Sequence, residues 1–479
     1  MNKWIKIREF LKKGKIGLIT LSSIVIFLAM AGISNSQAAT YYVNWDNGSD
    51  VTGDGSAGKP WKTPWHADDH IVQGDTVIIY PKRDGSVYYN NGSSVIDAHT
   101  SNTTWKAASG TPVWLSVTND HSSNPYQTCP FCTTISIDAP GITIDGFYVW
   151  GSILINYRGD NATIQNCDLS GGGDYQGFPA VIRTTGNIAK SSPPSDWCEN
   201  LLVRNCKIHD NVPAMPGQGV TNDMLVLTYG AKNVIIENCE FYNSLNSGIK
   251  WKDHCNKMTA RYNYFHDLPV GIQGDGQYGD DWIDTHNNIF VNISRQAIAP
   301  ESGAPNHFYV RNNTFYNCYA DIGYWRAGIN LEIFNNIFYH STSGQYFTKF
   351  DEQWAGLDYN YQDYNNYYST VTTNWYLNYA NRASTLSGWQ SYLASQSTCS
   401  DCRDARSVGI NPNFINSSGA FNLPTDFKRS SYPQNGRGGT WPSVMGAYIT
   451  GNEVIGVSGG PLPPPDTTPP APPTNLRIQ

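Results

Sequence analysis

The segment FYVRNN, residues 308–313, contains the pattern that decides the fold. A short run of β-branched and aromatic residues ends at an asparagine, and a second run, Thr314-Phe315-Tyr316, follows directly. Residues of the first kind favour strands, whereas asparagine favours the turn between strands. The pattern occurs in the segments ATIQNC (162–167), LVRNC (202–206), VIIENC (234–239), MTARYN (258–263), IDTHNN (283–288), FYVRNN (308–313) and LEIFNN (331–336).

The spacing of these segments indicates how the strands stack. The markers, one per segment, are Asn166, Asn205, Asn238, Asn263, Asn288, Asn313 and Asn336, and the last four intervals are 25, 25, 25 and 23 residues. Such a period is typical of a solenoid, and no unit shows the apolar period of a helix. We therefore predict an all-β parallel β-helix of about ten coils. Its corner carries one asparagine per coil as a ladder, and Cys167, Cys206 and Cys239 form a buried stack beside it.

This arrangement resembles the right-handed parallel β-helix of the pectate-lyase-like superfamily. The opening, with Tyr41-Tyr42-Val43 and Gly74-Asp75-Thr76-Val77, is similar to the first coil of bacterial members. The close, with Asn411-Pro412-Asn413-Phe414 and Met445-Gly446-Ala447-Tyr448, is similar as well. The resemblance implies a right-handed solenoid and an extracellular polysaccharide as ligand.

Three parts are expected along the chain. Residues 1–38 have the pattern of a signal peptide, because lysines and an arginine precede an apolar run that ends near Ser36-Gln37-Ala38. A retained N-terminal membrane anchor is the alternative. Residues 39–452 are predicted as the β-helix domain, and residues 453–479 as a proline-rich linker or tail. We expect a secreted or cell-surface protein.

The net charge limits the classes of partner that the protein can bind, and the cysteine spacing suits local disulfides. Removal of residues 1–38 changes the formal net charge from −7 to −12, and so acidic a surface argues against nucleic acid as a partner. We expect a monomer that has no membrane contact after signal removal. Cys129 and Cys132, and likewise Cys399 and Cys402, form C-x-x-C pairs that suit local disulfides, with zinc as the alternative.

A second alignment predicts which side chains share one outer face. Ile182, Val226, Ile249, Ile272, Ile298 and Ile322 fall in one register, and strand alternation directs the next residue and the third one outward. One outward column is Arg183, Leu227, Lys250, Gln273, Ala299 and Gly323, and the other is Thr185, Tyr229, Lys252, Asp275, Glu301 and Trp325. Because neighbouring coils lie about 4.8 Å apart, these side chains form a strip that suits an extended sugar chain.

The strip suggests β-elimination of an acidic polysaccharide. That reaction needs a base beside a uronic carboxylate and a cation that neutralises this carboxylate. The stretch from Ile249 to Asp253 resembles the lysine-bearing coil of alginate and dermatan lyases, which implies Lys252 as the base. The partner arginine of those lyases has no counterpart here, since Gln273 and Asp275 lie in that region. Lys250 is the second catalytic candidate, Arg183 is expected to bind a carboxylate, and a solvated lysine pair is the alternative.

Acidic residues allow two other interpretations. Asp275, Asp280, Asp281 and Asp284 form an oxygen-rich group, so calcium is a candidate cofactor there, with solvated turn acids as the alternative. Asp275 and Glu301 on successive coils are also candidate substrate contacts. As a carboxylate pair near the separation of about 5 Å that retaining hydrolases use, they would serve a glycoside hydrolase.

A glycan-binding or adhesion module without catalysis remains the main alternative to an enzyme. Such a module needs aromatic rings for sugar faces but no base. The aromatic candidates are Tyr157, Tyr229, Trp251, Tyr324 and Trp325.

Overall fold

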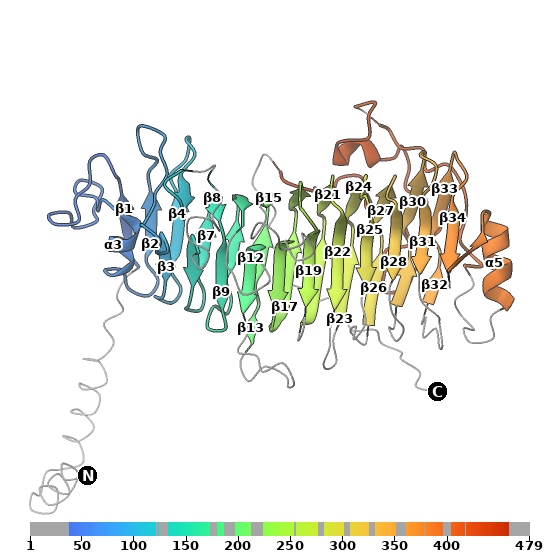
Figure 1. The fold of residues 1–479 in the computed structure, drawn as a ribbon, viewed down its shortest axis with the longest axis horizontal. Helices are drawn as coiled ribbons and strands as arrows, with labels where there is room; N and C mark the ends of the chain where they lie inside the picture. The colour runs from blue at the N-terminus through green and yellow to red at the C-terminus, as the bar shows by residue number, and fades with distance from the viewer. Residues whose placement is uncertain are drawn as a thin grey trace, which may run out of the picture. The chain divides into compact units, whose positions relative to one another are not determined.

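The computed structural model describes residues 38–120, 123, 133–172, 180–185, 197–211, 224–252, 255–275, 282–300, 307–324, 331–350, 361–377, 379–395, 404–416 and 418–458. One compact unit starts at Thr40. Its strands follow one another along one axis from α3 (Pro64–Asp68) to α5 (Leu386–Ser395) (Figure 1). Within the described ranges, no helix is long and apolar enough to cross a bilayer.

Three long sheets make up the unit, and each coil contributes a strand to sheet III, then to sheet I, then to sheet II. Sheet I has β1 (Thr40–Val43), β2 (Thr76–Ile79), β4 (Thr104–Ala107), β7 (Thr143–Asp145), β10 (Thr163–Gln165), β13 (Cys198–Glu199), β14 (Leu202–Arg204), β17 (Ala231–Glu237), β20 (Asn256–Arg261), β23 (Trp282–His286), β26 (His307–Arg311), β29 (Leu331–Phe334) and β32 (Tyr361–Asp363).

Sheet II has β5 (Trp114–Ser116), β8 (Tyr148–Gly151), β11 (Asp168–Gly171), β15 (Lys207–Asn211), β18 (Glu240–Tyr242), β21 (Tyr264–His266), β24 (Ile289–Val291), β27 (Thr314–Tyr316), β30 (Ile337–His340) and β33 (Asn366–Ser369). Sheet III has β3 (Ile96–Ala98), β6 (Ile135–Ile137), β9 (Ile153–Asn156), β12 (Ala180–Thr185), β16 (Met224–Tyr229), β19 (Ser247–Lys252), β22 (Val270–Asp275), β25 (Gln296–Pro300), β28 (Ala320–Tyr324), β31 (Tyr346–Phe350), β34 (Asn374–Leu377) and β35 (Ala380–Ala383).

The strand pairs are parallel, apart from β34 with β35 at the end of sheet III. The predicted parallel β-helix is therefore confirmed. Sheet II has ten strands, in line with the expected number of coils, and sheets I and III extend slightly further. Helix α5 closes the end of the stack, where Trp389 and Leu393 are buried and Trp389 stacks on Trp375.

The core consists of columns in which equivalent residues of successive coils touch. On sheet II, a column of stacked rings joins Phe241, Phe265, Phe290, Phe315, Phe338 and Tyr367 at centroid distances of 4.7 to 5.0 Å. The spacing matches the distance between parallel strands, so each ring lies flat on the next. Full burial of one such side chain stabilises the fold by about 1.5–3 kcal/mol.

The corner between sheets I and II contains two adjacent columns where the sequence predicted one. The residues with positive φ are Asn166, Asn205 and Asn238, followed by Tyr262, Asn287, Asn312, Asn335 and Tyr364. The next position, which points inward, holds Cys167, Cys206 and Cys239, followed by Asn263, Asn288, Asn313, Asn336 and Asn365. The prediction of a single marker was wrong, because the sequence changes from Asn-Cys to Asn-Asn or Tyr-Asn corners and the marker therefore moves by one residue after Asn238.

The inward asparagines bond to one another from coil to coil. The Nδ2 atoms of Asn263, Asn288 and Asn336 donate to the Oδ1 atom of the next asparagine at 3.0 Å, and that of Asn313 at 3.2 Å. The same Oδ1 atoms also accept the backbone N–H of the preceding asparagine. In the earlier coils, the buried thiols of Cys167, Cys206 and Cys239 take this position, as predicted.

The outer asparagines of the corner hold the C-terminal strap, which we define as residues 404–458. Asn335, Asn312, Asn287 and Asn238 donate through Nδ2 to the carbonyls of Pro442, Val444, Ala447 and Val454, respectively. The backbone N–H of Ser458 donates to Oδ1 of Asn205. The strap thus runs back along the stack over sheet II (Figure 1). Residues 453–458, which the sequence analysis assigned to the tail, contact the β-helix at Asn238 and Asn205.

The buried ladder gives the first testable prediction. Asn313→Ala removes the acceptor of both the backbone N–H and the side-chain amide of Asn288. Because each unsatisfied buried polar group costs about 1–3 kcal/mol, we expect a loss of about 2–4 kcal/mol in the free energy of unfolding. Chemical denaturation measures this loss. The exposed Asn452→Ala serves as the control and should stay within about 0.5 kcal/mol of wild type. Equal stability of the two variants would contradict a stabilising ladder.

Candidate functional site

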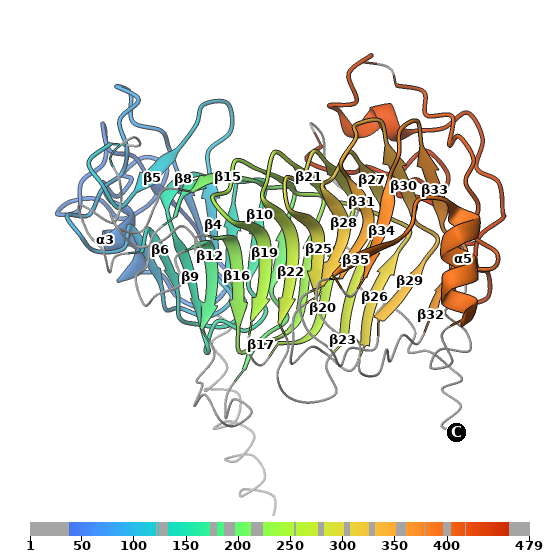
Figure 2. The same cartoon turned by 45° about the vertical axis from the view of Figure 1, so that its right-hand side comes forward.

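The outer face of sheet III has the register that the sequence predicted. Ile182, Val226, Ile249, Ile272, Ile298 and Ile322 are paired in succession by their Cα atoms. The adjoining positions Arg183, Leu227, Lys250, Gln273 and Ala299 are paired in the same way, as are Tyr229, Lys252 and Asp275. Figure 2 shows β16, β19, β22 and β25 side by side on this face. The predicted register is therefore confirmed for the described coils, whereas Arg183 and Ala299 are buried rather than exposed.

Strand β19 supplies the two candidate lysines. Ile249 and Trp251 are fully buried, whereas Lys250 and Lys252 are partly exposed on the opposite side of the strand. Alternate residues of a strand lie about 6.6 Å apart, so both ammonium groups can reach one sugar unit. The proposed use of Trp251 as an outward sugar-binding ring was wrong, because its side chain belongs to the core.

Polar and aromatic side chains flank these lysines on the neighbouring coils. Tyr229 on β16 and Gln273 on β22 are both partly exposed, and Oγ of Ser247 donates to Oε1 of Gln273 at 2.9 Å. This bond holds the Gln273 amide beside Lys250, to which its backbone is paired. Arg183 lies in the predicted column but is only 6% exposed. Its role in carboxylate binding stays a prediction.

Several predicted site residues lie outside the part of the chain that the structure describes. They are Glu301, Trp325, Asp280 and Asp281, together with the side chains of Asp275 and Tyr324. The two C-x-x-C pairs, Cys129 with Cys132 and Cys399 with Cys402, lie outside it as well. The substrate, metal and disulfide roles given to these residues remain predictions.

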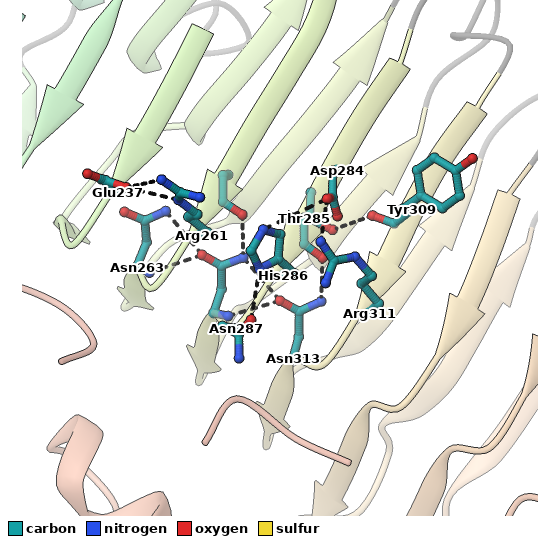
Figure 3. Close-up of polar contacts among 12 residues, drawn as sticks. Glu237, Arg261, Asn263, Asp284, Thr285, His286, Asn287, Tyr309, Arg311 and Asn313 are labelled. Atoms are coloured by element: carbon teal, nitrogen blue, oxygen red, sulfur yellow. Dashed lines mark hydrogen bonds and ion pairs between the residues drawn. The ribbon is translucent and has the colours of Figure 1, made fainter. Parts of the chain in front are cut away.

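Asp284 is held in a different environment from the one expected for an open metal site. It lies on β23 of sheet I, whereas Asp275 lies on β22 of sheet III. Its side chain is fully buried, and Nη2 of Arg311 lies 2.6 Å from Oδ2 (Figure 3). Trp441 of the strap covers the Arg311 guanidinium at 4.4 Å. Asp284 is thus engaged by an arginine, and its proposed calcium contact has to compete with that ion pair.

A second ion pair lies on the same sheet. Both Nε and Nη2 of Arg261 donate to Oε2 of Glu237, and both side chains are buried (Figure 3). His286 lies between Arg261 and Arg311 in the sheet register. Burial and the positive charge of Arg311 lower the pKa of His286 to about 3, so its ring is neutral. Because both ion pairs are buried and each acid is engaged by its arginine, they act as structural supports.

No group of three or more His, Cys, Asp or Glu side chains within the described ranges has the geometry of a metal site. Calcium therefore depends on residues beyond those ranges and stays a prediction.

A ring stack on the outer face of sheet II was not predicted from the sequence. Tyr242 lies between His209, at a centroid distance of 4.5 Å, and His266, at 5.2 Å. His209 contacts Asp168 and Asp210, and His266 contacts Glu240 and Asp267. Burial lowers the pKa of each histidine, but the hydrogen bonds to carboxylates outweigh it and raise the pKa overall. Only the coil register, which aligns residues from separate repeats, brings these rings together.

Comparison with known proteins agrees with the geometry. Residues 133–315 match the family model described as the right handed beta helix region. The match covers less than half of the chain, and it agrees with the parallel β-helix that the three sheets form. The fold that the sequence predicted, a right-handed parallel β-helix, is confirmed.

Individual relatives cover parts of the chain. A capsule K1-specific depolymerase of Klebsiella phage K64-1 is 26% identical over 145 residues, which span 29% of this chain and 16% of that protein. A solved rhamnogalacturonan lyase is 13% identical, covers 65% of this chain and 84% of its own, and has a TM-score of 0.48. A solved pectate lyase is 12% identical, covers 88% and 98%, and has a TM-score of 0.47.

The ring stack predicts a pH dependence of stability. Because the pKa values of His209 and His266 are raised in the folded state, their stabilising contribution is complete below the unfolded value of about 6.5. This contribution is lost as pH rises through the folded values. We expect the melting temperature of wild type to fall as the pH rises above about 6.5, and to fall less in His209→Gln/His266→Gln. His70→Gln, at an exposed position, is the control, and identical pH profiles for all three proteins would contradict the prediction.

Proposed function

We propose that this protein binds an acidic extracellular polysaccharide along the outer face of sheet III and cleaves it by β-elimination. The observation that carries the proposal is the placement of Lys250 and Lys252. Both project, partly exposed, from one side of β19, in register with Tyr229 and Gln273 on the neighbouring coils. An extended polymer that crosses the coils would meet cationic, aromatic and amide groups in turn.

The chemistry assigns a role to each side chain. Lys252, as the neutral amine, takes the proton next to the uronic carboxylate and becomes an ammonium. The electrons of that C–H bond form the new double bond, and the glycosidic oxygen leaves with its sugar chain and takes up a proton from water. Lys250 and Arg183, which lie two coil steps apart, bind carboxylates, and the carboxylate of the reacting unit gains negative charge in the transition state. A second positive charge beside a lysine also favours the neutral amine that the base requires.

The relative named as a capsule depolymerase supports a polysaccharide as substrate, although the match covers 16% of that protein. Tyr229, together with the predicted contacts Asp275, Glu301 and Trp325, would bind sugar units next to the cleaved bond. We propose export by the N-terminal segment and action outside the cell, at the surface or in the medium. The protein is proposed to act as a monomer.

Calcium is proposed as a cofactor that acidic side chains would hold and that would neutralise the substrate carboxylate. Asp275, Asp280 and Asp281 would provide oxygen ligands, with Asp284 available only if it leaves Arg311. In that case, a chelator would abolish activity and added calcium would restore it.

The test is the ultraviolet absorbance of unsaturated uronides when the purified protein is incubated with polygalacturonate, alginate or glycosaminoglycans. We expect wild type to produce the signal on at least one polymer. Lys252→Ala should lower the rate by about 10²- to 10⁴-fold, the typical contribution of a positioned base. Lys207→Ala, an exposed strand lysine on sheet II, is the matched control and should leave the rate unchanged.

Other outcomes identify the alternatives. Binding without any product, unchanged by Lys252→Ala, would indicate a non-catalytic glycan-binding module. New reducing ends without unsaturation, abolished by Asp275→Asn or Glu301→Gln, would indicate a glycoside hydrolase. Either result would overturn β-elimination.

A further inference from the structure

The outward column of sheet III continues beyond the residues that the sequence singled out. Gly323 on β28 pairs with Lys349 on β31, and Lys349 pairs with Tyr376 on β34. Lys349 thus lies in the same column as Lys250, four coil steps further along the stack. At about 4.8 Å per step, the two lysines are about 19 Å apart. One continuous face therefore carries a second cationic position.

Three tyrosines surround Lys349. Its Nζ atom lies 5.6 Å from the ring centre of Tyr319 and 5.5 Å from that of Tyr376. Tyr346 lies edge-on between the two tyrosines, at centroid distances of 5.5 Å and 5.7 Å. Both lysine distances are within the range of cation–π attraction, so the rings hold the ammonium in place. We call these four residues the tyrosine cluster.

The cluster is open on its outer side. Tyr319 is 40% exposed, and Tyr346, Lys349 and Tyr376 are partly exposed. Large aromatic side chains are normally buried, so three of them around one cation on an outer face need a reason. Tyrosine combines an apolar ring face with a hydroxyl that can donate or accept a hydrogen bond. A sugar ring presents the matching combination of C–H faces and hydroxyls.

The column between Lys250 and the cluster is lined by small side chains. Gln273 is followed by Ala299 and Gly323, which are buried at the base of the face. The side chain of Gln296 lies against Gly323, where a Cβ atom would come within 2.3 Å of it. The column therefore contributes no long side chain of its own between Gln273 and Lys349, and the Gln296 side chain fills the space beside Gly323.

We propose that the tyrosine cluster is a distal subsite for an acidic sugar unit of the same polysaccharide chain that reaches Lys250 and Lys252. The Tyr319 and Tyr376 rings pack on sugar faces, and Lys349 binds the carboxylate. This inference rests on the proposed function for its choice of polymer. It adds that the protein recognises a stretch of several units that spans the coils from β19 to β34.

Two variants test the subsite, with polygalacturonate and alginate as probes. Tyr319→Ala removes one ring at an exposed position, and Lys349→Met removes the charge but keeps an unbranched side chain. We expect each to weaken affinity for the polymer, measured by affinity electrophoresis, by about three- to tenfold. If wild type cleaves the polymer, KM should rise by the same factor while kcat is unchanged. Tyr80→Ala, a tyrosine 39% exposed near sheet I, is the matched control and should change nothing.

Chain length separates a subsite from a structural role. Oligosaccharides of two or three units bound at Lys250 cannot reach the cluster, so both variants should handle them like wild type. Polymer affinities equal to wild type in both variants would overturn the subsite, even if Lys252→Ala confirms β-elimination. Conversely, weaker polymer binding by both variants without any product from wild type would keep the subsite and reject the lyase. Equal losses on polymer and short oligosaccharides would indicate a structural role and overturn the proposal.

Discussion

The coil-to-coil hydrogen bond between buried asparagine side chains is the interaction on which the C-terminal half of the stack depends. An inward turn in each coil buries polar backbone groups, and burial without partners would be costly. Asn263, Asn288, Asn313 and Asn336 meet this need because each amide donates to the asparagine of the next coil and accepts a backbone N–H from the coil before. Such bonding requires identical coil geometry, so it also sets the register of all three sheets.

That register decides what each outer face presents. On sheet II, Tyr264, Ile289 and Val291 form an apolar surface in the later coils, and the strap covers it with Phe427, Tyr448 and Ile455. The strap is held by the outer asparagines of the same corner. The corner that forms the ladder therefore also holds the strap in place. On sheet I, the Glu237–Arg261 and Asp284–Arg311 pairs are buried and occupied by each other. Sheet III remains the face on which partly exposed lysines and tyrosines from successive coils stand in line.

A parallel β-helix is suited to polymer recognition because its coil spacing repeats along one direction, as the units of a polysaccharide do. Residues far apart in the chain, such as Lys250 and Lys349, are aligned by four coil steps. Because of this geometry, residues of one site can lie far apart in the sequence, but a shift in strand register would misplace them. A one-residue slip would turn Lys250 and Lys252 inward and bring Trp251 to the surface.

The sequence by itself determined the all-β solenoid, the period near 25 residues, the buried cysteines and the register of the sheet III columns. These features follow from local patterns that recur along the chain. Only the tertiary structure decided the split of the corner into two columns, the path of the strap, the burial of Asp284 against Arg311 and the tyrosine cluster. Each of these depends on which coils become neighbours and which segment covers them. The sequence of one repeat does not indicate which residues a hundred positions away will contact it.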